Sequence, residues 1–362
     1  MSTWTDRRLI DLLGVAAPVL QAPMAGASTP AMAIGAARGG GLGSLPCAQY
    51  TPDQAREAIA QFRAAVDAPL NLNFFAHTPP APDPARMMAW RARLAPYYVE
   101  AGLDPAPPPP AGGRAPFDEA FCALVEDLRP EVVSFHFGLP EPALLDRVKA
   151  AGAKVLSSAT TVAEAVWLEV NGADVVIAMG AEAGGHRAVF LPGFGQGIDK
   201  TIDNRLDSAA QPGLFSLLPQ VVSAVSAPVI AAGGIAEARG VAAARALGAS
   251  GVQVGTAYLF TPEAKIPPAH RAALDEARDD NTMITDLFTG RPARGVANRL
   301  MLELGPIGGG ITPPFPLAGG ALTPLRREGT NADFTNLWAG QSARLAPRGL
   351  NSEDLTRLLA DA

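Results

Sequence analysis

The sequence predicts an α/β protein built as a (β/α)8 barrel of the TIM type, with a smaller, partly helical C-terminal segment or lid. Short apolar runs alternate with alanine-rich amphipathic segments from residue 18 to residue 255, which is typical of parallel strands that helices cover on both faces. Glycine and polar residues follow the ends of many of these runs, where barrel enzymes place their functional residues. A doubly wound open sheet is the alternative, but it concentrates such residues at one switch point.

Eight apolar runs are expected to form the strands, at residues 18–21, 41–45, 69–75, 131–135, 154–158, 174–179, 228–232 and 251–255. Seven amphipathic segments are expected to form helices between them, at residues 30–38, 52–66, 118–128, 142–150, 162–170, 215–225 and 237–247. Several of these segments begin with proline or follow Ser, Thr or Asp, which are helix-start signals.

Two long connections interrupt this alternation. Residues 76–116 contain clusters of proline, which fit neither a helix interior nor a central strand, so we expect an extended excursion around a short helix near residues 85–94. Residues 188–213 form the second connection. Loops of this length are usually functional or disordered, and surface decoration is the other interpretation.

Beyond Thr256 the pattern departs from the barrel. We expect a helix at residues 267–278, an extended segment at 282–288, and helices at 334–344 and 352–359. The chain is accordingly divided into three parts. Residues 1–256 are expected to form the barrel with the inserted loop 76–116, residues 257–345 a smaller domain or lid across the barrel mouth, and residues 346–362 a C-terminal helix.

Composition limits the class of protein. A hydrophobic fraction of 48% with 18% charged residues indicates a soluble protein with a large core. The net charge of −6 argues against nucleic acid or an anionic membrane surface as the main partner. Two cysteines give no disulfide framework. With no signal peptide or spanning segment at the N-terminus, a cytoplasmic protein is expected. The oligomeric state stays open, and a homodimer is one option.

Residues 180–187 (GAEAGGHR) form the most informative stretch, because they directly follow the apolar run that ends at Met179. Glycines allow a backbone to approach a ligand closely, and a histidine changes protonation near neutral pH. We therefore expect one loop to contain both a cofactor-binding backbone and a side chain that can transfer protons. His186 is the candidate catalytic residue, and a histidine packed in the core is the alternative interpretation.

Two further glycine turns predict a phosphate site. Gly233 and Gly234 follow the seventh predicted strand, and Gly255 and Thr256 follow the eighth. In barrels these two positions commonly hold phosphate through backbone N–H groups and a helix N-terminus. Tight turns without a ligand are the alternative.

Other polar residues are less specific. Asn73 ends an apolar strand, and its amide needs a partner such as a flavin edge, a nicotinamide edge or a backbone carbonyl. His136 either assists the site or packs between aromatic residues, and His77 is expected to hydrogen-bond within the proline-rich excursion. His270 is expected on the surface, and Cys47 as a small buried residue. The spacing of histidines and cysteines predicts no metal site.

Several motifs, taken together, resemble the nitronate monooxygenases, formerly grouped as 2-nitropropane dioxygenases. They are residues 21–26 (QAPMAG), 71–77 (NLNFFAH), 134–140 (SFHFGLP), 180–187, 231–235 (AAGGI), 253–256 (QVGT) and 336–341 (NLWAGQ). These motifs occur in order across nearly the whole chain. Members of this family are barrel proteins that depend on FMN.

The resemblance implies an FMN-dependent enzyme that uses O2 to oxidise alkyl nitronates, or nitroalkanes, to a carbonyl compound and nitrite, a detoxification reaction. It implies that His186 either removes the α-proton of a neutral nitroalkane or holds the nitronate oxygens. The implied FMN contacts are Ala22, Pro23, Met24, Asn73, Met179, Gly180, Gly184, Gly233 and Gly234, together with Gln253, Val254, Gly255 and Thr256 around the phosphate.

One position departs from the family pattern, since Met179 stands where the pattern has glutamine, and a thioether cannot donate a hydrogen bond. Two alternative functions remain at this point. The first is an FMN-dependent enoyl-ACP reductase that uses NAD(P)H, which shares a similar loop at residues 182–186. The second is a flavin-binding module without catalytic activity.

Overall fold

The computed structural model describes residues 4–81, 83–104, 114–191, 210–308 and 310–362. Its main body is a sheet of eight parallel strands in the order β1-β9-β8-β6-β5-β4-β3-β2. The sheet closes because Leu42, just before β2, exchanges backbone hydrogen bonds with Val19 and Gln21 of β1. The predicted barrel is therefore confirmed, and the open sheet is excluded.

The strands of the barrel are β1 (Val19–Gln21), β2 (Gly43–Leu45), β3 (Leu70–Phe75), β4 (Val132–His136), β5 (Lys154–Ala159), β6 (Val175–Met179), β8 (Val229–Ala232) and β9 (Gly251–Val254). Each lies within two residues of its predicted position at either end. Almost every strand residue is buried, because the barrel interior covers one face of each strand and helices cover the other.

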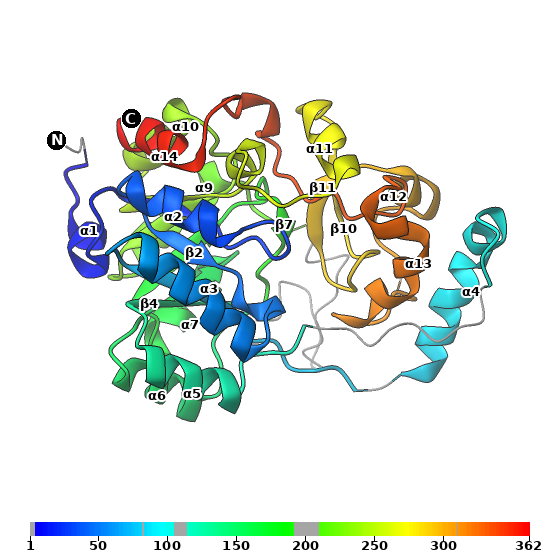
Figure 1. Ribbon diagram of the computed structural model, residues 1–362, viewed down its shortest axis with the longest axis horizontal. Coiled ribbons are helices and arrows are strands. Elements are labelled where there is room, and N and C mark those ends of the chain that lie inside the picture. The colour runs from blue at the N-terminus through cyan, green and yellow to red at the C-terminus, as the bar shows by residue number, and fades with distance from the viewer. Residues whose placement is uncertain (1–3, 82, 105–113, 192–209, 309) are drawn as a thin grey trace.

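The helices around the barrel are α2 (Pro30–Arg38), α3 (Pro52–Ala65), α5 (Glu119–Leu128), α6 (Pro142–Ala150), α7 (Val162–Val170), α9 (Leu214–Ala224), α10 (Ala238–Ala246) and α14 (Ser352–Ala360), with the short helices η1 (Cys47–Gln49) and η2 (Thr256–Phe260) at strand ends. Helix α1 (Arg8–Leu13) lies at the end of the barrel away from the strands' carboxyl ends (Figure 1). There Leu9 and Leu13 pack against the interior strand residues.

Helix α14 comes back from the far end of the sequence to complete the helical ring beside α2 (Figure 1). Glycines make this close approach possible. A Cβ atom added at Gly35 would lie 2.8 Å from Ser352 Cβ, and one added at Gly39 would lie 2.5 Å from Thr356 Cβ. The hydroxyl of Thr356 is hydrogen-bonded to that of Tyr258 at 2.7 Å.

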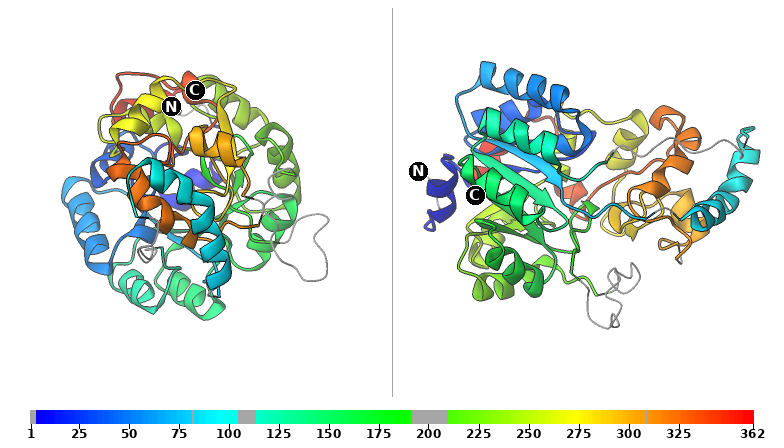
Figure 2. Two further views of the ribbon diagram at one scale, coloured as in Figure 1. Left: turned by 90° about the vertical axis from the view of Figure 1, so that its right-hand side faces the viewer. Right: turned by 90° about the horizontal axis from the view of Figure 1, so that it is seen from below.

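A second unit, here called the accessory unit, stands at the carboxyl ends of the strands (Figures 1 and 2). It contains a three-stranded antiparallel sheet in the order β10-β11-β7. Its elements are β7 (Gly185–His186), β10 (Thr282–Thr285), β11 (Ala293–Val296), α4 (Pro84–Glu100), α11 (Pro268–Asp275), α12 (Arg299–Leu304), η3 (Leu317–Leu322), α13 (Thr323–Arg326), η4 (Arg327–Gly329) and η5 (Ala343–Leu345).

Two distant parts of the sequence share the apolar core of the accessory unit. Trp90 and Leu94 of α4 pack with Phe288, Met301 and Leu322 from the C-terminal part. The predicted short helix in the proline-rich excursion is therefore longer than expected and continues through an internal proline to Glu100. Its buried apolar face compensates for the backbone hydrogen bond that proline cannot make.

One helix prediction is wrong. Residues 334–344 are largely extended, with a backbone bridge from Trp338 to Gly295 and a single short turn of 3₁₀ helix at their end. Leu337 accepts a hydrogen bond from Val296 N, and Ala339 donates one to Arg294 O. The edge of β11 thus satisfies the backbone of this segment and overrides its helical composition.

The remaining predictions have mixed outcomes. Helix α14 and the extended start of residues 282–288 are confirmed. Most of the loop 188–213 lies outside the described residues. No helix in the part of the chain that the structure describes is long and apolar enough to cross a membrane.

Candidate active site

A cavity of about 410 Å³ opens at the carboxyl ends of the barrel strands, between the barrel and the accessory unit. Most of the predicted site residues line it, namely Ala22, Pro23, Met24, Asn73, Met179, Gly184, His186, Gly233, Gly234, Gln253, Gly255 and Thr256. Two predicted residues do not line it. Val254 is buried in the layer between barrel and helices, and Gly180 packs closely against Leu214 and Glu182.

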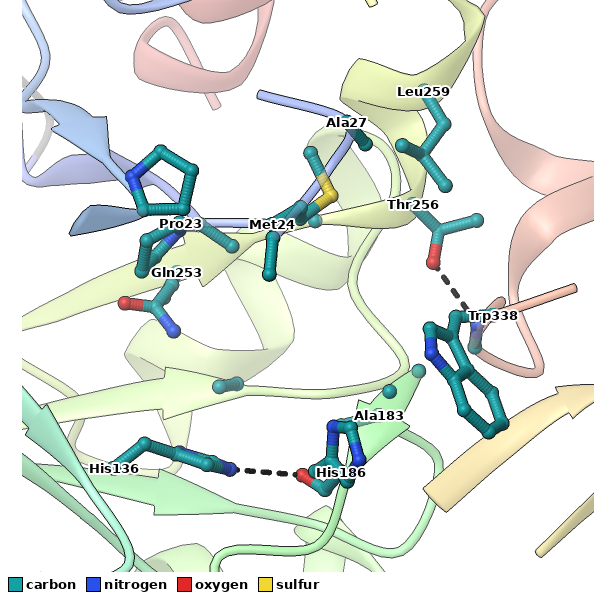
Figure 3. A pocket seen from close by; sticks show the side chains of 18 of the residues that line it. Pro23, Met24, Ala27, His136, Ala183, His186, Gln253, Thr256, Leu259 and Trp338 are labelled. Atoms are coloured by element: carbon teal, nitrogen blue, oxygen red, sulfur yellow. Dashed lines mark hydrogen bonds between the residues drawn. The ribbon is translucent and has the colours of Figure 1, made fainter. Parts of the chain in front are cut away.

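Residues from opposite strands face each other across the cavity. Figure 3 shows the rings of His136 and His186 on one wall and the side chains of Met24 and Gln253 on the other. The loop after β1 is held in shape by Ser28, whose hydroxyl accepts from Met24 N at 3.0 Å. The side-chain amide of Gln253 makes no hydrogen bond to a described residue, so it is available to a ligand.

The turns after β8 and β9 form one end of the cavity. Gly233 and Gly234 have φ angles of 107° and 71°, a conformation that a side chain would strain. The backbone N–H groups of Gly234, Gly255 and Thr256 donate to no acceptor among the described residues. Unpaired N–H groups at the start of a short helix form a concave site for an anion.

The extended segment that contains residues 338–342 is tied to this end of the cavity. Gly340 N donates to Thr256 Oγ1 at 2.9 Å, and Ser342 Oγ donates to Gly234 O at 2.8 Å. A Cβ atom at Gly184 would lie 2.6 Å from the backbone of Ala339. Gly184 therefore permits close packing of this segment on the loop after β6, in addition to any contact with a ligand.

His186 is held by regular structure and not by a loose loop. It belongs to β7, where it pairs with Ala293 of β11, and its Nε2 is hydrogen-bonded to Thr289 Oγ1 at 2.9 Å. Its ring packs against Phe315 at 5.2 Å and against Trp338 at 5.6 Å between centroids. The accessory unit thus supplies packing partners for this glycine-rich loop.

The proton affinity of His186 is low. Burial lowers its pKa well below the usual value, and the positive charge of Arg114 lowers it further, followed by His136 and Arg291. The imidazole is therefore neutral at neutral pH. A protonated His186 would add a cation to surroundings that already contain two arginines.

Two buried arginines fix the loop that carries His186. Arg187 is fully buried and donates to the carbonyl oxygens of Met179 and Gly180, each at 2.7 Å. Arg294 donates to Ala181 O at 2.7 Å. Burial lowers the pKa of Arg187 to about 10, so it remains a cation at neutral pH. Three successive carbonyl groups are thus held by charge-assisted hydrogen bonds.

The other histidines and Asn73 have defined partners or surroundings. His136 donates from Nε2 to the backbone oxygen of His186 at 3.1 Å, and burial lowers its pKa to about 4. Asn73 donates to Ser134 Oγ at 2.9 Å. His77 is buried among phenyl rings, and its Nδ1 has no partner within the described residues. Within the described residues, the hydrogen bond expected for His77 is therefore not made at Nδ1.

Two further expectations have clear outcomes. His270 is buried, and its Nε2 donates to Trp338 O at 3.0 Å, so the expected surface position is wrong. The neighbouring segment 336–341 covers this face of α11, which helix composition alone does not reveal. Cys47 is buried as expected, and burial raises the pKa of its thiol to about 12.

Four residues of the site were not singled out from the sequence. Arg114 and Lys265 line the cavity with positive charge, and Trp338 supplies an aromatic wall. Thr289 holds His186. Only Trp338 lies in a recognisable motif; the other three occupy irregular segments without periodicity.

A (β/α)8 barrel with glycine turns after its last two strands and a histidine at its mouth belongs to the class of barrel enzymes. The family follows from comparison with known proteins. A model of the family described as nitronate monooxygenase matches residues 6–361. The chain belongs to the nitronate monooxygenase family, whose members are flavin-dependent oxidoreductases.

Relatives and solved structures agree with this assignment. The chain is 39% identical to a nitronate monooxygenase of Pseudomonas aeruginosa over 99% of both chains. It is 38% identical to one of Paraburkholderia phytofirmans, over 98% of this chain and 94% of that protein. The crystal structure of a nitroalkane oxidase from Streptomyces ansochromogenes matches with a TM-score of 0.84 and 36% identity, over 98% and 96% of the chains. FabK from Thermotoga maritima matches with a TM-score of 0.69 and 27% identity, over 97% and 94%.

Proposed function

We propose that this protein uses FMN and O2 to oxidise alkyl nitronates to a carbonyl compound and nitrite. One observation carries the proposal. A neutral His186 and the Arg114 cation, which has no counter-ion among the described residues, share one end of the cavity, and backbone N–H groups that could hold a phosphate lie at the other end. An anionic substrate and a cofactor with a phosphate tail match these two ends. Family membership and the similarity to the nitronate monooxygenase of Pseudomonas aeruginosa support the same reaction.

The residues present fit FMN. The free N–H groups of Gly234, Gly255 and Thr256 would hold the phosphate, as proposed for the turns after the last two strands of a barrel. The unpaired amide of Gln253 would hydrogen-bond to the edge of the isoalloxazine ring. Ala22, Pro23 and Met24 supply an apolar surface on the same side. When bound, FMN would accept an electron from the substrate and pass it to oxygen.

His186 would bind the substrate as a neutral hydrogen-bonding group. Positive charge nearby opposes protonation of its ring, which makes it a weak base, and the same charge stabilises a bound anion. Thr289 fixes the orientation of the imidazole through Nε2. These properties support the role of holding nitronate oxygens over that of removing an α-proton, although the similar Streptomyces protein is named a nitroalkane oxidase.

Anaerobic rapid mixing tests the reaction. The FMN-loaded protein is mixed with ethyl nitronate or with NADPH, and the flavin absorbance is followed. We expect ethyl nitronate to lower the absorbance of the oxidised flavin, NADPH to leave that absorbance unchanged, and oxygen to restore it with release of nitrite. Bleaching by NADPH alone would instead establish the enoyl-ACP reductase alternative, and no bleaching by either would indicate a binding module.

The variant His186→Asn tests the role of the histidine. If His186 holds the nitronate, the KM for ethyl nitronate rises by about tenfold or more, because a hydrogen bond to an anion is lost. If His186 acts as the base, oxidation of neutral nitroethane is abolished while oxidation of preformed nitronate is preserved. The variant Thr289→Val provides a milder change, because it removes only the group that orients the ring.

A further inference from the structure

Arg114 is a cation at the cavity wall with no counter-ion among the described residues. It lines the cavity at the end of the proline-rich excursion. Within the part of the chain that the structure describes, it makes neither a hydrogen bond nor an ion pair. Its guanidinium carbon lies 5.9 Å from the centroid of the Phe315 ring. Burial lowers its pKa, yet a guanidinium remains charged at neutral pH.

Phe315 places this cation beside His186. The Phe315 ring packs against the His186 ring with centroids 5.2 Å apart, so the guanidinium and the imidazole are neighbours of the same phenyl group. A cation that rests on an aromatic ring keeps its N–H edge free for a further partner. The edge of Arg114 is therefore available to a molecule bound next to His186.

Acidic side chains are scarce among the described residues that line the cavity. Glu182 is the one carboxylate among the described residues that line the cavity, and it accepts the N–H of Leu214 at the start of α9. Arg291 lies against Phe137, with its guanidinium carbon 4.0 Å from the ring centroid. Arg326 is half-buried, and its pKa is lowered to about 10 by desolvation and by Arg114.

Arg114 lies on the side of the barrel opposite the phosphate turns. Phe315 packs on Phe75, which ends β3, and on Phe137, which follows β4. In the closed strand order, β3 and β4 stand across the barrel from β8 and β9. A cofactor phosphate at the turns after β8 and β9 is therefore not the partner of Arg114.

We propose that Arg114 binds the planar, two-oxygen anionic group of the substrate and sets the preference of this site for anions over neutral analogues. The fork of N–H groups on a guanidinium matches two coplanar oxygens, whether they belong to a nitronate or to a carboxylate. This inference rests on the proposed function for the identity of the substrate. It assigns a specificity-determining role to a residue of the proline-rich excursion.

A binding experiment tests the proposal without turnover. Propionate has the shape and charge of ethyl nitronate but does not react, and propionamide is its neutral counterpart. Both are titrated calorimetrically into FMN-loaded wild type, Arg114→Gln, Arg114→Lys and Arg239→Gln. The last variant removes the same charge from a side chain that is 80% exposed on the surface.

We expect Arg114→Gln to weaken propionate binding by about ten- to hundredfold, as for loss of a charged hydrogen bond, and to change propionamide binding by less than about twofold. Arg114→Lys should recover part of the loss, and Arg239→Gln should behave as wild type. Equal effects on both ligands, unchanged propionate binding in Arg114→Gln, or no preference for propionate in wild type would overturn the proposal.

Kinetics with ethyl nitronate separate this inference from the proposed function. A rise in KM in Arg114→Gln, with a smaller change in kcat, supports both. If wild type fails to oxidise ethyl nitronate while Arg114→Gln still loses propionate binding, the proposed function is wrong and the anion site stands. If ethyl nitronate is oxidised with an unchanged KM and propionate binding is also unchanged, only the role of Arg114 is wrong.

Discussion

At the scale of single residues, the most unusual environment is that of His77. Its ring lies between Phe137 and Phe315, with centroids 6.1 Å and 4.8 Å away, and Nδ1 is buried without a partner within the described residues. Burial, with a smaller effect from Arg291, lowers its pKa to about 4. A buried polar atom without a partner costs free energy, so this histidine is a weak point of an otherwise apolar cluster.

The variant His77→Phe tests this interpretation through the pH dependence of stability. Because the pKa in the folded state lies below the unfolded value near 6.5, the unfolded chain binds the proton first as pH falls. Stability is fully present above about pH 6.5 and is lost as pH falls toward 4. We expect wild type to lose about 1–2 kcal/mol of unfolding free energy from His77 between pH 7 and pH 5.

Urea unfolding of both proteins at pH 7 and pH 5 provides the measurement. His77→Phe should show a smaller loss on acidification and equal or greater stability at pH 7, because a phenyl ring needs no partner. An identical pH dependence of stability in the two proteins would mean that burial does not lower the pKa of His77.

At the scale of elements, the barrel could be predicted because proline and glycine mark the ends of its helices and strands. Thr29 and Thr51 cap helices whose first residue is proline, and each apolar run has the length of a strand. The two-residue strand β7 could not be predicted, since two residues show no periodicity. The segment at residues 334–344 was misassigned because its composition suits a helix, while a distant strand edge decides its conformation.

Contact between α2 and α14 yields a prediction at this scale. Gly35→Ala would place a methyl group within 2.8 Å of Ser352 Cβ, so we expect a loss of about 1–3 kcal/mol from overpacking. Gly240→Ala is the matched control within α10, because its added Cβ would lie 3.4 Å from the nearest atom. That variant should gain about 0.5–1 kcal/mol from helix propensity.

Thermal or urea unfolding of the two variants checks this difference in sign. If both substitutions stabilise the protein, α14 can shift away from α2 at little cost and is not firmly packed on the barrel. If both destabilise it, helix α10 contains a constraint that the surrounding distances do not reveal.

At the scale of the whole molecule, the cavity depends on parts of the sequence that are far apart. Residues 22–24, 233–234 and 253–256 come from the barrel, and residues 338–342 are hydrogen-bonded to Gly234 and Thr256. The motifs predicted most of these residues, because glycine after a strand has a local signature. Arg114 could not be found in this way, since its importance arises only from the approach of Phe315, two hundred residues later in the sequence.

Cofactor binding should therefore stabilise the whole protein. We expect FMN at a hundredfold excess over its dissociation constant to add about 2.7 kcal/mol of stability to the apoprotein. Riboflavin, which lacks the phosphate, should add much less if the turns after β8 and β9 bind that group. Thermal melting against each ligand is the measurement, and equal shifts with FMN and riboflavin would contradict the assigned phosphate site.

The hydrogen bonds from Gly340 and Ser342 to the turns after β9 and β8 have a consequence during protein synthesis. A ribosome produces residues 22–24 long before residue 340, so a growing chain holds only part of the pocket for most of translation. Chains that stop before residue 340 lack these two hydrogen bonds, so we expect them to bind FMN more weakly than the full chain does. If FMN binds as proposed, retained yellow flavin would therefore mark chains in which the segment around residue 340 has been made and has docked on the barrel.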